Sequence, residues 1–219
     1  MFQTLIRMMN SNHPTKQILI DTAVALLDEL PMDRVTSDLV LEKSKISKGS
    51  LYHHFPDFGH LIDEAQAIRF ARSVDLSISS MTNTLRTANT PAEVLQNINE
   101  LTRYTQAEGR SEARRARVHL LGLATNRPYL QELLSGEQSR LNAAIADIIR
   151  EAQERGLVRS NVDPLAVALL IQGYSLGLWL DDISAERVDP QAWIGLIDRL
   201  IATLIVAEPE PNLDSPASN

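Results

Sequence analysis

The chain has 219 residues, a formal net charge of −7 and 44% hydrophobic residues. This composition is sufficient for a sizeable core and excludes disorder throughout, while the negative charge argues against nucleic-acid binding over the whole surface. The chain has no cysteine, which excludes disulfides, cysteine-metal sites and thiol-based redox sensing. No basic, apolar leader opens the chain, so we expect a cytoplasmic protein.

Apolar residues at helical spacing predict an all-α protein of about nine helices. Residues 1–13 carry one charge and are predicted to be a flexible arm; an arm laid along DNA is the alternative, although such arms usually carry more arginines. The first helix begins at Pro14 and ends before Pro31. Its first turn, with Thr15 and Lys16, could contact phosphate through backbone amides and the ammonium group.

The segment 35–61 predicts two short helices, a tight turn and the start of a long third helix. Thr36 is a suitable cap for the first helix, Lys45 lies in the turn, and Ser47 is a suitable cap for the second helix. On this second helix Leu51 and Phe55 are four residues apart and are expected to point inward. The outer side then carries Lys48, Gly49, Ser50, Tyr52, His53 and His54. A short helix of this kind suits a DNA groove, and the segment is interpreted as a helix-turn-helix.

The same segment resembles the DNA-binding domain of TetR-family transcriptional regulators over Thr15 to about Ala65. The matching positions are Ser47, Gly49, Ser50, Leu51, Tyr52, His54, Phe55 and Leu61. There are two departures. Ser44 and Lys45 stand where the family usually has Ala-Gly, which predicts a positive φ at Lys45, and Phe58 replaces a phosphate-contacting lysine.

The outer residues of the second helix are assigned roles by their chemistry. Tyr52 and Thr36 are expected to contact phosphate, Lys48 a phosphate or guanine, and His53 a base edge or phosphate. That these side chains are merely exposed remains an alternative. Residues 1–61 hold six Lys or Arg against seven Asp or Glu, so we expect DNA binding that depends on a dimer and is strongly sensitive to salt.

A long helix is expected from Asp57 to Leu85, followed by helices that start near Pro91, Ser111, Pro128, Pro164 and Pro190. Residues 207–219 are rich in Pro, Ser and acidic residues and are predicted to be disordered. The predicted organisation is therefore a helix-turn-helix domain over residues 14–60 and an effector-binding and dimerisation domain over 61–206.

The stretch from Pro164 to Leu180 carries no charge. Three interpretations are open: a membrane span, for which the stretch is short, the interior of one subunit, and a helix shared between the subunit core and a partner. The third, a four-helix interface of the kind found in TetR-family dimers, is favoured because Gly173 and Gly177 allow a close helix approach. The expected interface residues are Leu169, Gly173, Gly177, Trp193, Ile197, Leu200 and Leu204.

The arginine group of Arg110, Arg114, Arg115 and Arg117 has two interpretations: a solvated, salt-bridged helix face, or a contribution to a cavity that holds an acidic ligand. The candidate pocket residues are Tyr104, Arg117, His119, Tyr174 and Trp179. Residues of this kind more often belong to an ordinary core, which is the alternative for each of them.

Sequence motifs of the common enzyme and metal sites are absent, so neither catalysis nor a metal or other cofactor is predicted. The predicted function is a ligand-responsive regulator: a homodimeric repressor that binds a palindromic, double-stranded DNA operator and is released by a small-molecule effector. A helical binding protein that has lost operator binding is the first alternative, and an all-helical enzyme is the second.

Overall fold

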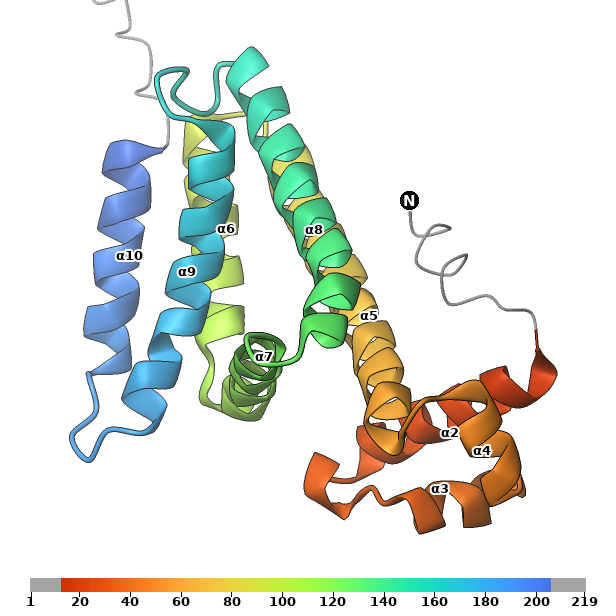
Figure 1. Cartoon of the computed structure of the whole chain (residues 1–219). Helices are drawn as coiled ribbons and strands as arrows, with labels where there is room; N and C mark the ends of the chain where they lie inside the picture. The colour runs from red at the N-terminus through yellow and green to blue at the C-terminus, as the bar shows by residue number, and fades with distance from the viewer. Residues whose placement is uncertain (1–12, 206–219) are drawn as a thin grey trace, which may run out of the picture. The chain divides into compact units, whose positions relative to one another are not determined.

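The computed structural model describes residues 13–205, so the predicted arm, apart from His13, and the predicted tail lie outside the described residues. Within this range the chain forms α-helices joined by short connections, and two of these connections contain 3₁₀ turns (Figure 1). The helices are α2 (Pro14–Glu29), α3 (Ser37–Ser44), α4 (Lys48–His54), α5 (Phe58–Arg86), α6 (Pro91–Gln106), α7 (Ser111–Ala124), α8 (Pro128–Glu154), α9 (Pro164–Asp182) and α10 (Pro190–Leu204). No β-strand occurs between residues 13 and 205, and the predicted all-α class is confirmed.

Local capping interactions explain where several helices begin. The Thr36 hydroxyl accepts a hydrogen bond from Leu39 N at the start of α3, and the Asp163 carboxylate accepts one from Ala166 N at the start of α9. At α6 the Thr90 hydroxyl accepts from Glu93 N. Each bond satisfies an amide that has no partner inside its helix, so these starts are encoded locally. Proline in the first turn of α2, α6, α9 and α10 adds a preset φ.

The described chain divides into two compact units that do not follow the predicted domain boundary. Unit 1 comprises residues 13–77 and 116–141, and unit 2 comprises residues 78–115 and 142–205. Helices α5, α7 and α8 therefore contribute residues to both units. The boundary placed near residue 60 by the sequence stays a prediction.

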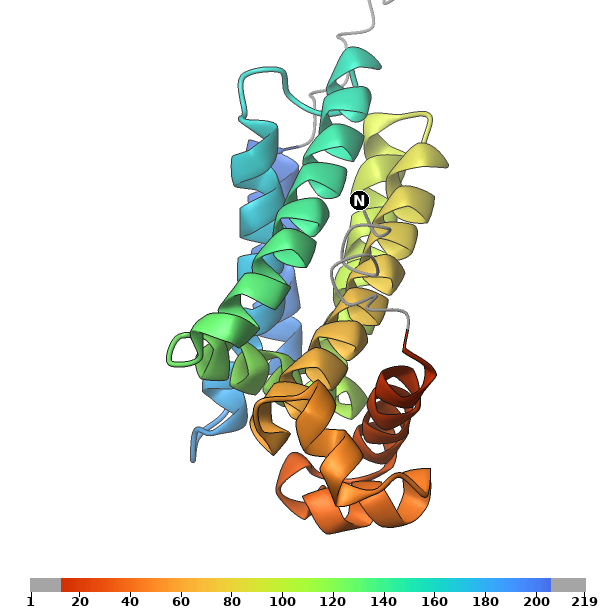
Figure 2. The same ribbon diagram turned by 45° about the vertical axis from the view of Figure 1, so that its right-hand side comes forward.

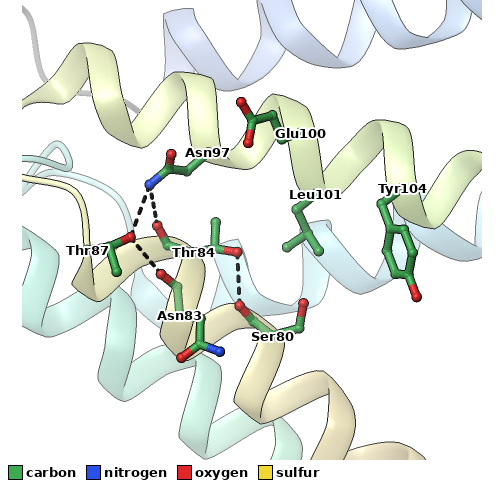
Figure 3. A pocket seen from close by; sticks show the side chains of 8 residues that line it. All are labelled: Ser80, Asn83, Thr84, Thr87, Asn97, Glu100, Leu101 and Tyr104. Carbon is green, nitrogen blue, oxygen red and sulfur yellow. Dashed lines mark hydrogen bonds between the residues drawn. The ribbon is translucent and has the colours of Figure 1, made fainter.

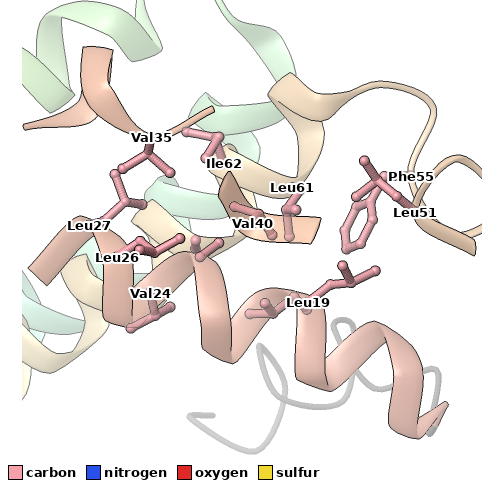
Figure 4. Packing of buried hydrophobic residues seen from close by; sticks show 13 residues of the cluster. Leu19, Val24, Leu26, Leu27, Val35, Val40, Leu51, Phe55, Leu61 and Ile62 are labelled. Carbon is pink, nitrogen blue, oxygen red and sulfur yellow. The ribbon is translucent and has the colours of Figure 1, made fainter. Parts of the chain in front are cut away.

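Unit 1 contains the helix-turn-helix, whose core is built from α2, α3, α4 and the start of α5 (Figure 4). Leu19, Val40, Leu51 and Leu61 each expose none of their surface, and Phe55 exposes 1%. Burial of this many large apolar side chains stabilises the unit and fixes the angle at which α4 is presented. Phe58 packs partly buried against the same cluster, so the side chain that replaces the family's lysine contributes to the core.

In unit 2, α9 runs beside α10 in both views of the molecule (Figures 1 and 2). A Cβ atom at Gly177 would lie 3.6 Å from Trp193 Cη2, an ordinary van der Waals contact, so the tryptophan ring of α10 packs beside this position of α9 within the same chain. One side of α9 is buried through Val167, Ala168, Ile171 and Tyr174. The other side is apolar and open, since Leu165, Leu169 and Leu180 are 52%, 63% and 66% exposed. The expectation that this helix lies partly outside the core of a single chain is consistent with this arrangement.

By length and composition α9 is also the one described helix that could cross a membrane. Core and interface helices of globular proteins meet the same criteria, so this carries little weight on its own.

Candidate nucleic-acid interface and effector region

Helix α4 separates an apolar inner side from a polar outer side. Ser47 begins it by accepting a hydrogen bond from Ser50 N at 3.2 Å, and Phe55 N closes it on Leu51 O. Leu51 and Phe55 anchor the helix in the unit 1 core, whereas Tyr52 keeps 45% of its surface exposed. Most of the residues expected to read DNA are exposed, namely Thr36, Lys45, Ser47, Lys48, Gly49, Tyr52 and His53, while Thr15, Lys16, Ser50 and His54 are half-buried.

The turn between α3 and α4 uses the left-handed backbone conformation. Lys45 adopts φ 60° and ψ 21°, and its N–H donates to Leu41 O as the C-terminal cap of α3. Lys45 is the one non-glycine residue with positive φ among residues 13–205, and the positive φ predicted from the sequence is confirmed. The conformation carries a steric cost for a residue with a Cβ, and the Lys45 side chain is exposed in the turn that precedes α4.

Three imidazoles gather where the start of α2 meets the end of α4. The ring centroids of His13 and His54 are 4.5 Å apart, and those of His53 and His54 are 5.1 Å apart. Burial, His13, His53 and Lys16 lower the pKa of His54, in that order of importance. No group of three or more His, Asp or Glu side chains within residues 13–205 has a geometry that could hold a metal ion.

Lys16 already has a partner within the chain, and this partner competes with the phosphate contact predicted for Lys16. Its Nζ donates to Glu64 Oε1 at 2.9 Å and lies 5.2 Å from the centroid of the Phe55 ring. Glu64 is 4% exposed and accepts a second hydrogen bond at the same oxygen from the Tyr129 hydroxyl at 2.8 Å. The first turns of α2 and α8 are thus both joined to α5 through one buried carboxylate.

A second buried carboxylate lies next to the first. Asp63 is 3% exposed and forms an ion pair with Arg127 at 3.0 Å. Burial raises the pKa of Asp63, and the nearby arginine opposes that shift. Burial and the hydrogen bond to Glu64 raise the pKa of Tyr129. Arg127 also donates to Gly59 O at 3.3 Å, and a Cβ at Gly59 would lie 2.9 Å from its Nη2, so a larger residue here would displace the end of the arginine side chain.

The predicted pocket residues have different surroundings. Tyr174 is buried and its hydroxyl lies 3.2 Å from Thr102 Oγ1, and burial raises its pKa. Tyr104 and His119 are exposed. Arg117 is half-buried 5.3 Å from the Phe70 ring centroid, where burial lowers its pKa, and Trp179 is half-buried on α9.

Arg114 has a structural role that neither interpretation of the arginine group included. It is 7% exposed, and its Nη2 lies 3.2 and 3.3 Å from the two carboxylate oxygens of Asp182. Its Nη1 donates to the carbonyl oxygens of Thr105 and Ala107. The guanidinium therefore joins the α6–α7 connection to the end of α9, and removal of either charge would leave the other one buried and unpaired.

The predicted interface residues occupy two environments. Leu169 and Gly173 are exposed, and Trp193 and Leu200 are half-buried. Ile197 is 5% exposed and already packed within its own chain, while Gly177 faces Trp193. Leu204 ends α10. More apolar surface is exposed by the leucines of α9 and by Leu196 of α10, which is 50% exposed, than by Trp193, Ile197 and Leu200.

Unit 2 also contains a groove of about 380 Å³ between α5 and α6 (Figure 3). The α5 side is lined by Ser80, Asn83, Thr84 and Thr87, and the α6 side by Asn97, Glu100, Leu101 and Tyr104. Of the pocket residues predicted from the sequence, Tyr104 lines this groove. The other lining residues were missed, although both sets repeat at i, i+3, i+4 and i+7, a spacing that places each set on one face of its helix.

A short helix with an apolar anchor, preceded by a capped helix and a tight turn, defines this chain as a helix-turn-helix DNA-binding regulator. Residues 19–65 match the family model of bacterial regulatory proteins of the tetR family, and residues 91–206 match that of the BetI-type transcriptional repressor C-terminal domain. The chain belongs to the TetR family of transcriptional regulators, which places it among DNA-binding regulators rather than enzymes.

Solved structures share the fold at low sequence identity. A TetR-family regulator from Mesorhizobium loti is 18% identical, with a TM-score of 0.61 over 86% of this chain and 94% of that one. Salmonella enterica GusR is 18% identical, with a TM-score of 0.60 over 87% and 95%. A regulator from Saccharomonospora viridis in complex with choline is 20% identical, with a TM-score of 0.59 over 88% and 98%. Among curated proteins none matches.

Proposed function

We propose that this protein is a cytoplasmic repressor that binds a palindromic operator as a homodimer and releases it when a small molecule binds. The observation that carries the proposal is the surface of α4, where Lys48, Tyr52 and His53 are exposed while Leu51 and Phe55 are buried as anchors. An anchored helix with cationic, phenolic and imidazole groups on its outer side is the arrangement that reads a major groove.

The proposed contacts divide into positioning and reading. Thr36, Ser47 and Tyr52 position the helix on phosphates, with the first two acting from helix starts where amides point outward. Lys48 and His53 reach base edges or phosphates, and Gly49 and Ser50 permit close approach. Thr15 contributes its backbone amide, whereas Lys16 first has to leave Glu64 and is the weakest member of this set.

The homodimer is proposed to form through the exposed side of α9 and the adjacent part of α10. Leu165, Leu169 and Leu180 present apolar surface at helical spacing, and exposed apolar stripes of this kind mark interaction sites. Gly173 between them lets a second helix approach closely. A two-fold axis through this interface would duplicate α4, and half-sites about 34–36 Å apart would give specificity that a single short helix lacks.

The effector is proposed to act by changing the position of α5, which connects the regulatory helices to the DNA-binding helices. Within unit 1, Glu64 of α5 holds Lys16 of α2 and Tyr129 of α8 at hydrogen-bond distance. A displacement of α5 or α8 would therefore move Lys16 at the start of α2. Because Lys16 lies over the Phe55 ring, the end of α4 would also be affected. Differential effector affinity corresponding to ~1–3 kcal/mol of coupling would suffice for regulation.

The identity of the effector is open to direct screening. Tyr174, Trp179, Arg117 and His119 remain candidates for contact with it, as does Tyr104. The choline complex of the Saccharomonospora viridis regulator makes choline a reasonable first compound to test for release of DNA.

The test is fluorescence anisotropy with DNA from the region upstream of the protein's own gene, at several salt concentrations. We expect tight binding that weakens steeply as salt rises, and a loss of roughly tenfold to a hundredfold for the Lys48→Ala/Tyr52→Ala variant. The matched control is Arg115→Ala/Tyr104→Ala, which removes one exposed cation and one exposed tyrosine outside the helix-turn-helix and should bind normally.

The same measurement distinguishes the repressor from a second candidate function. Phe58 packs into the core where the family has a phosphate-contacting lysine, which favours a helical binding protein that has lost operator binding as the second candidate. No binding to upstream DNA or to a pool of random duplexes, or binding with no salt dependence, would support that candidate and contradict the repressor.

A further inference from the structure

The groove between α5 and α6 has an unusual lining. Side chains that meet between adjacent helices are usually apolar at the contact and charged at its edges. Here the α5 side offers hydroxyl and amide groups alone, from Ser80, Asn83, Thr84 and Thr87, over about 10 Å of helix. All eight lining residues lie in unit 2, so the groove is complete within one compact part of the molecule.

Half of the side-chain hydrogen-bond donors in this lining are already used. Thr84 donates to Ser80 O at 2.9 Å and Thr87 donates to Asn83 O at 2.7 Å. The Asn97 amide donates to Thr84 O at 2.8 Å and to Thr87 Oγ1 at 3.4 Å (Figure 3). What these side chains have left are acceptor lone pairs, including Asn97 Oδ1. Ser80, Asn83 and the Tyr104 hydroxyl can accept as well as donate.

The one charged side chain of the groove favours a cationic ligand. Glu100 is its one charged lining residue, and one carboxylate oxygen accepts from Gln96 Nε2 at 3.1 Å while the other is available. Tyr104 follows one turn later, and the Arg110 guanidinium lies 4.5 Å from its ring centroid. One face of the ring is thus occupied by a cation of the chain itself, and the negative charge for a ligand cation comes from Glu100, one turn earlier on α6.

We propose that the α5–α6 groove is a binding site for small aliphatic amines whose ammonium groups carry N–H donors, such as short diamines. One ammonium group binds Glu100, the second group donates to the acceptors along α5, and Tyr104 lines the same groove one turn further along α6. A quaternary ammonium ion has no N–H to satisfy those acceptors and binds more weakly. An anionic ligand is disfavoured by the charge of Glu100.

This site goes beyond the proposed function, because amine binding requires neither an operator nor a dimer. It rests on the proposed function only where binding is expected to alter DNA affinity: the groove includes the last turns of α5, the helix through which regulation is proposed to act. Binding measured without DNA therefore separates a failure of this site from a failure of the repressor.

The experiment is isothermal titration calorimetry of the full chain with 1,4-diaminobutane, 1,4-butanediol and tetramethylammonium. The diol matches the length of the diamine without its charge, and tetramethylammonium keeps the charge without the donors. Three variants accompany the wild type: Glu100→Gln, Tyr104→Leu and, as control, Glu154→Gln. Glu154 is an exposed carboxylate at the end of α8 in the same unit, so its replacement changes the net charge equally.

We expect the diamine to bind and the other two compounds to bind at least several-fold more weakly. Glu100→Gln should weaken diamine binding about fivefold and Tyr104→Leu about threefold, with Glu154→Gln unchanged. The proposal is overturned if the diamine does not bind, if the diol or tetramethylammonium binds equally well, or if Glu100→Gln behaves like Glu154→Gln. Because all three positions are exposed, each variant should fold, which circular dichroism will verify.

Discussion

The helix-turn-helix and α9 distribute their side chains in opposite ways. In the helix-turn-helix, Leu51 and Phe55 are buried to within 1% and the polar side chains of α4 face outward. On α9 the leucines face outward, while polar groups elsewhere in unit 2, such as Arg114 and Thr102, are buried. The apolar core of the helix-turn-helix is completely covered within one chain. Helix α9 has an apolar surface that a single chain leaves uncovered, which is the physical reason to expect a partner there.

The strongest way to break this contrast is to charge the exposed side of α9. Leu169→Glu would place two symmetry-related carboxylates in an apolar interface, and we expect the dimer to weaken by roughly 4 kcal/mol, about a thousandfold in its dissociation constant. Operator affinity should fall with it, because half-site duplication is lost. Sedimentation analysis and DNA anisotropy measure the two effects.

Leu76→Glu is the matched control for that change. Leu76 is a leucine of α5 that is 73% exposed and lies in unit 1, outside the proposed interface. Its replacement should leave the oligomeric state unchanged. A Leu169→Glu protein that stays dimeric would remove α9 from the interface.

The next largest effect should come from a change in the core of the helix-turn-helix. Leu51→Ala deletes a side chain with no exposed surface and should lower the free energy of unfolding by about 3 kcal/mol. Because the cavity is internal to one chain, the loss should be the same at every protein concentration. Leu169→Ala removes the same atoms from a proposed interface, so its effect should shrink as the protein is diluted to concentrations at which the wild type is also monomeric. Urea unfolding at several concentrations distinguishes the two, and identical behaviour would contradict the contrast.

The helix-turn-helix was largely predictable because the residues that determine it are close together in the chain. The caps at Thr36 and Ser47, the inward pair Leu51 and Phe55, and the positive φ of Lys45 each depend on neighbours within about four residues. Spacing and propensity carry such information. The same kind of signal predicted the helix starts at Pro91, Ser111, Pro128, Pro164 and Pro190, where the structure has them.

The pairings between distant residues were not predictable in the same way. Arg114 and Asp182 are 68 residues apart, and Lys16 and Glu64 are 48 apart. Helical periodicity shows that a polar residue lies near a buried face, but it does not identify the partner that makes burial tolerable. Ile197 illustrates the complementary case: its place on the apolar side of α10 was clear from spacing, whereas its burial within its own chain depends on packing.

Tyr129→Phe tests one of these distant pairings, in which polar groups are buried inside unit 1. The variant loses the hydrogen bond to the Glu64 carboxylate and should be less stable than the wild type by about 1.5 kcal/mol at neutral pH. The pKa of Tyr129 is raised in the folded state, so this contribution is fully present below the unfolded pKa of about 10 and is lost as the pH rises through the folded pKa.

The difference between wild type and Tyr129→Phe should therefore be constant from neutral pH to about 9 and shrink in more alkaline solution. Urea unfolding over this range measures it. Tyr174, whose pKa is also raised, is present in both proteins and cancels in the comparison. A difference near zero at neutral pH would mean that the bond to Glu64 contributes nothing to stability.

The smallest effect should be a gain in stability at the turn of the helix-turn-helix. Lys45 has φ 60°, where a Cβ is sterically unfavourable, so Lys45→Gly should raise the free energy of unfolding by about 0.5–1 kcal/mol. Lys43→Gly is the matched control: it removes the same charge from an exposed position inside α3, where glycine should cost about 1 kcal/mol. If Lys45 was retained for contact with DNA, Lys45→Gly will be more stable and yet bind the operator more weakly. A variant that gains stability at no cost in affinity would remove Lys45 from the proposed DNA-contacting residues and leave the strained turn without a functional reason.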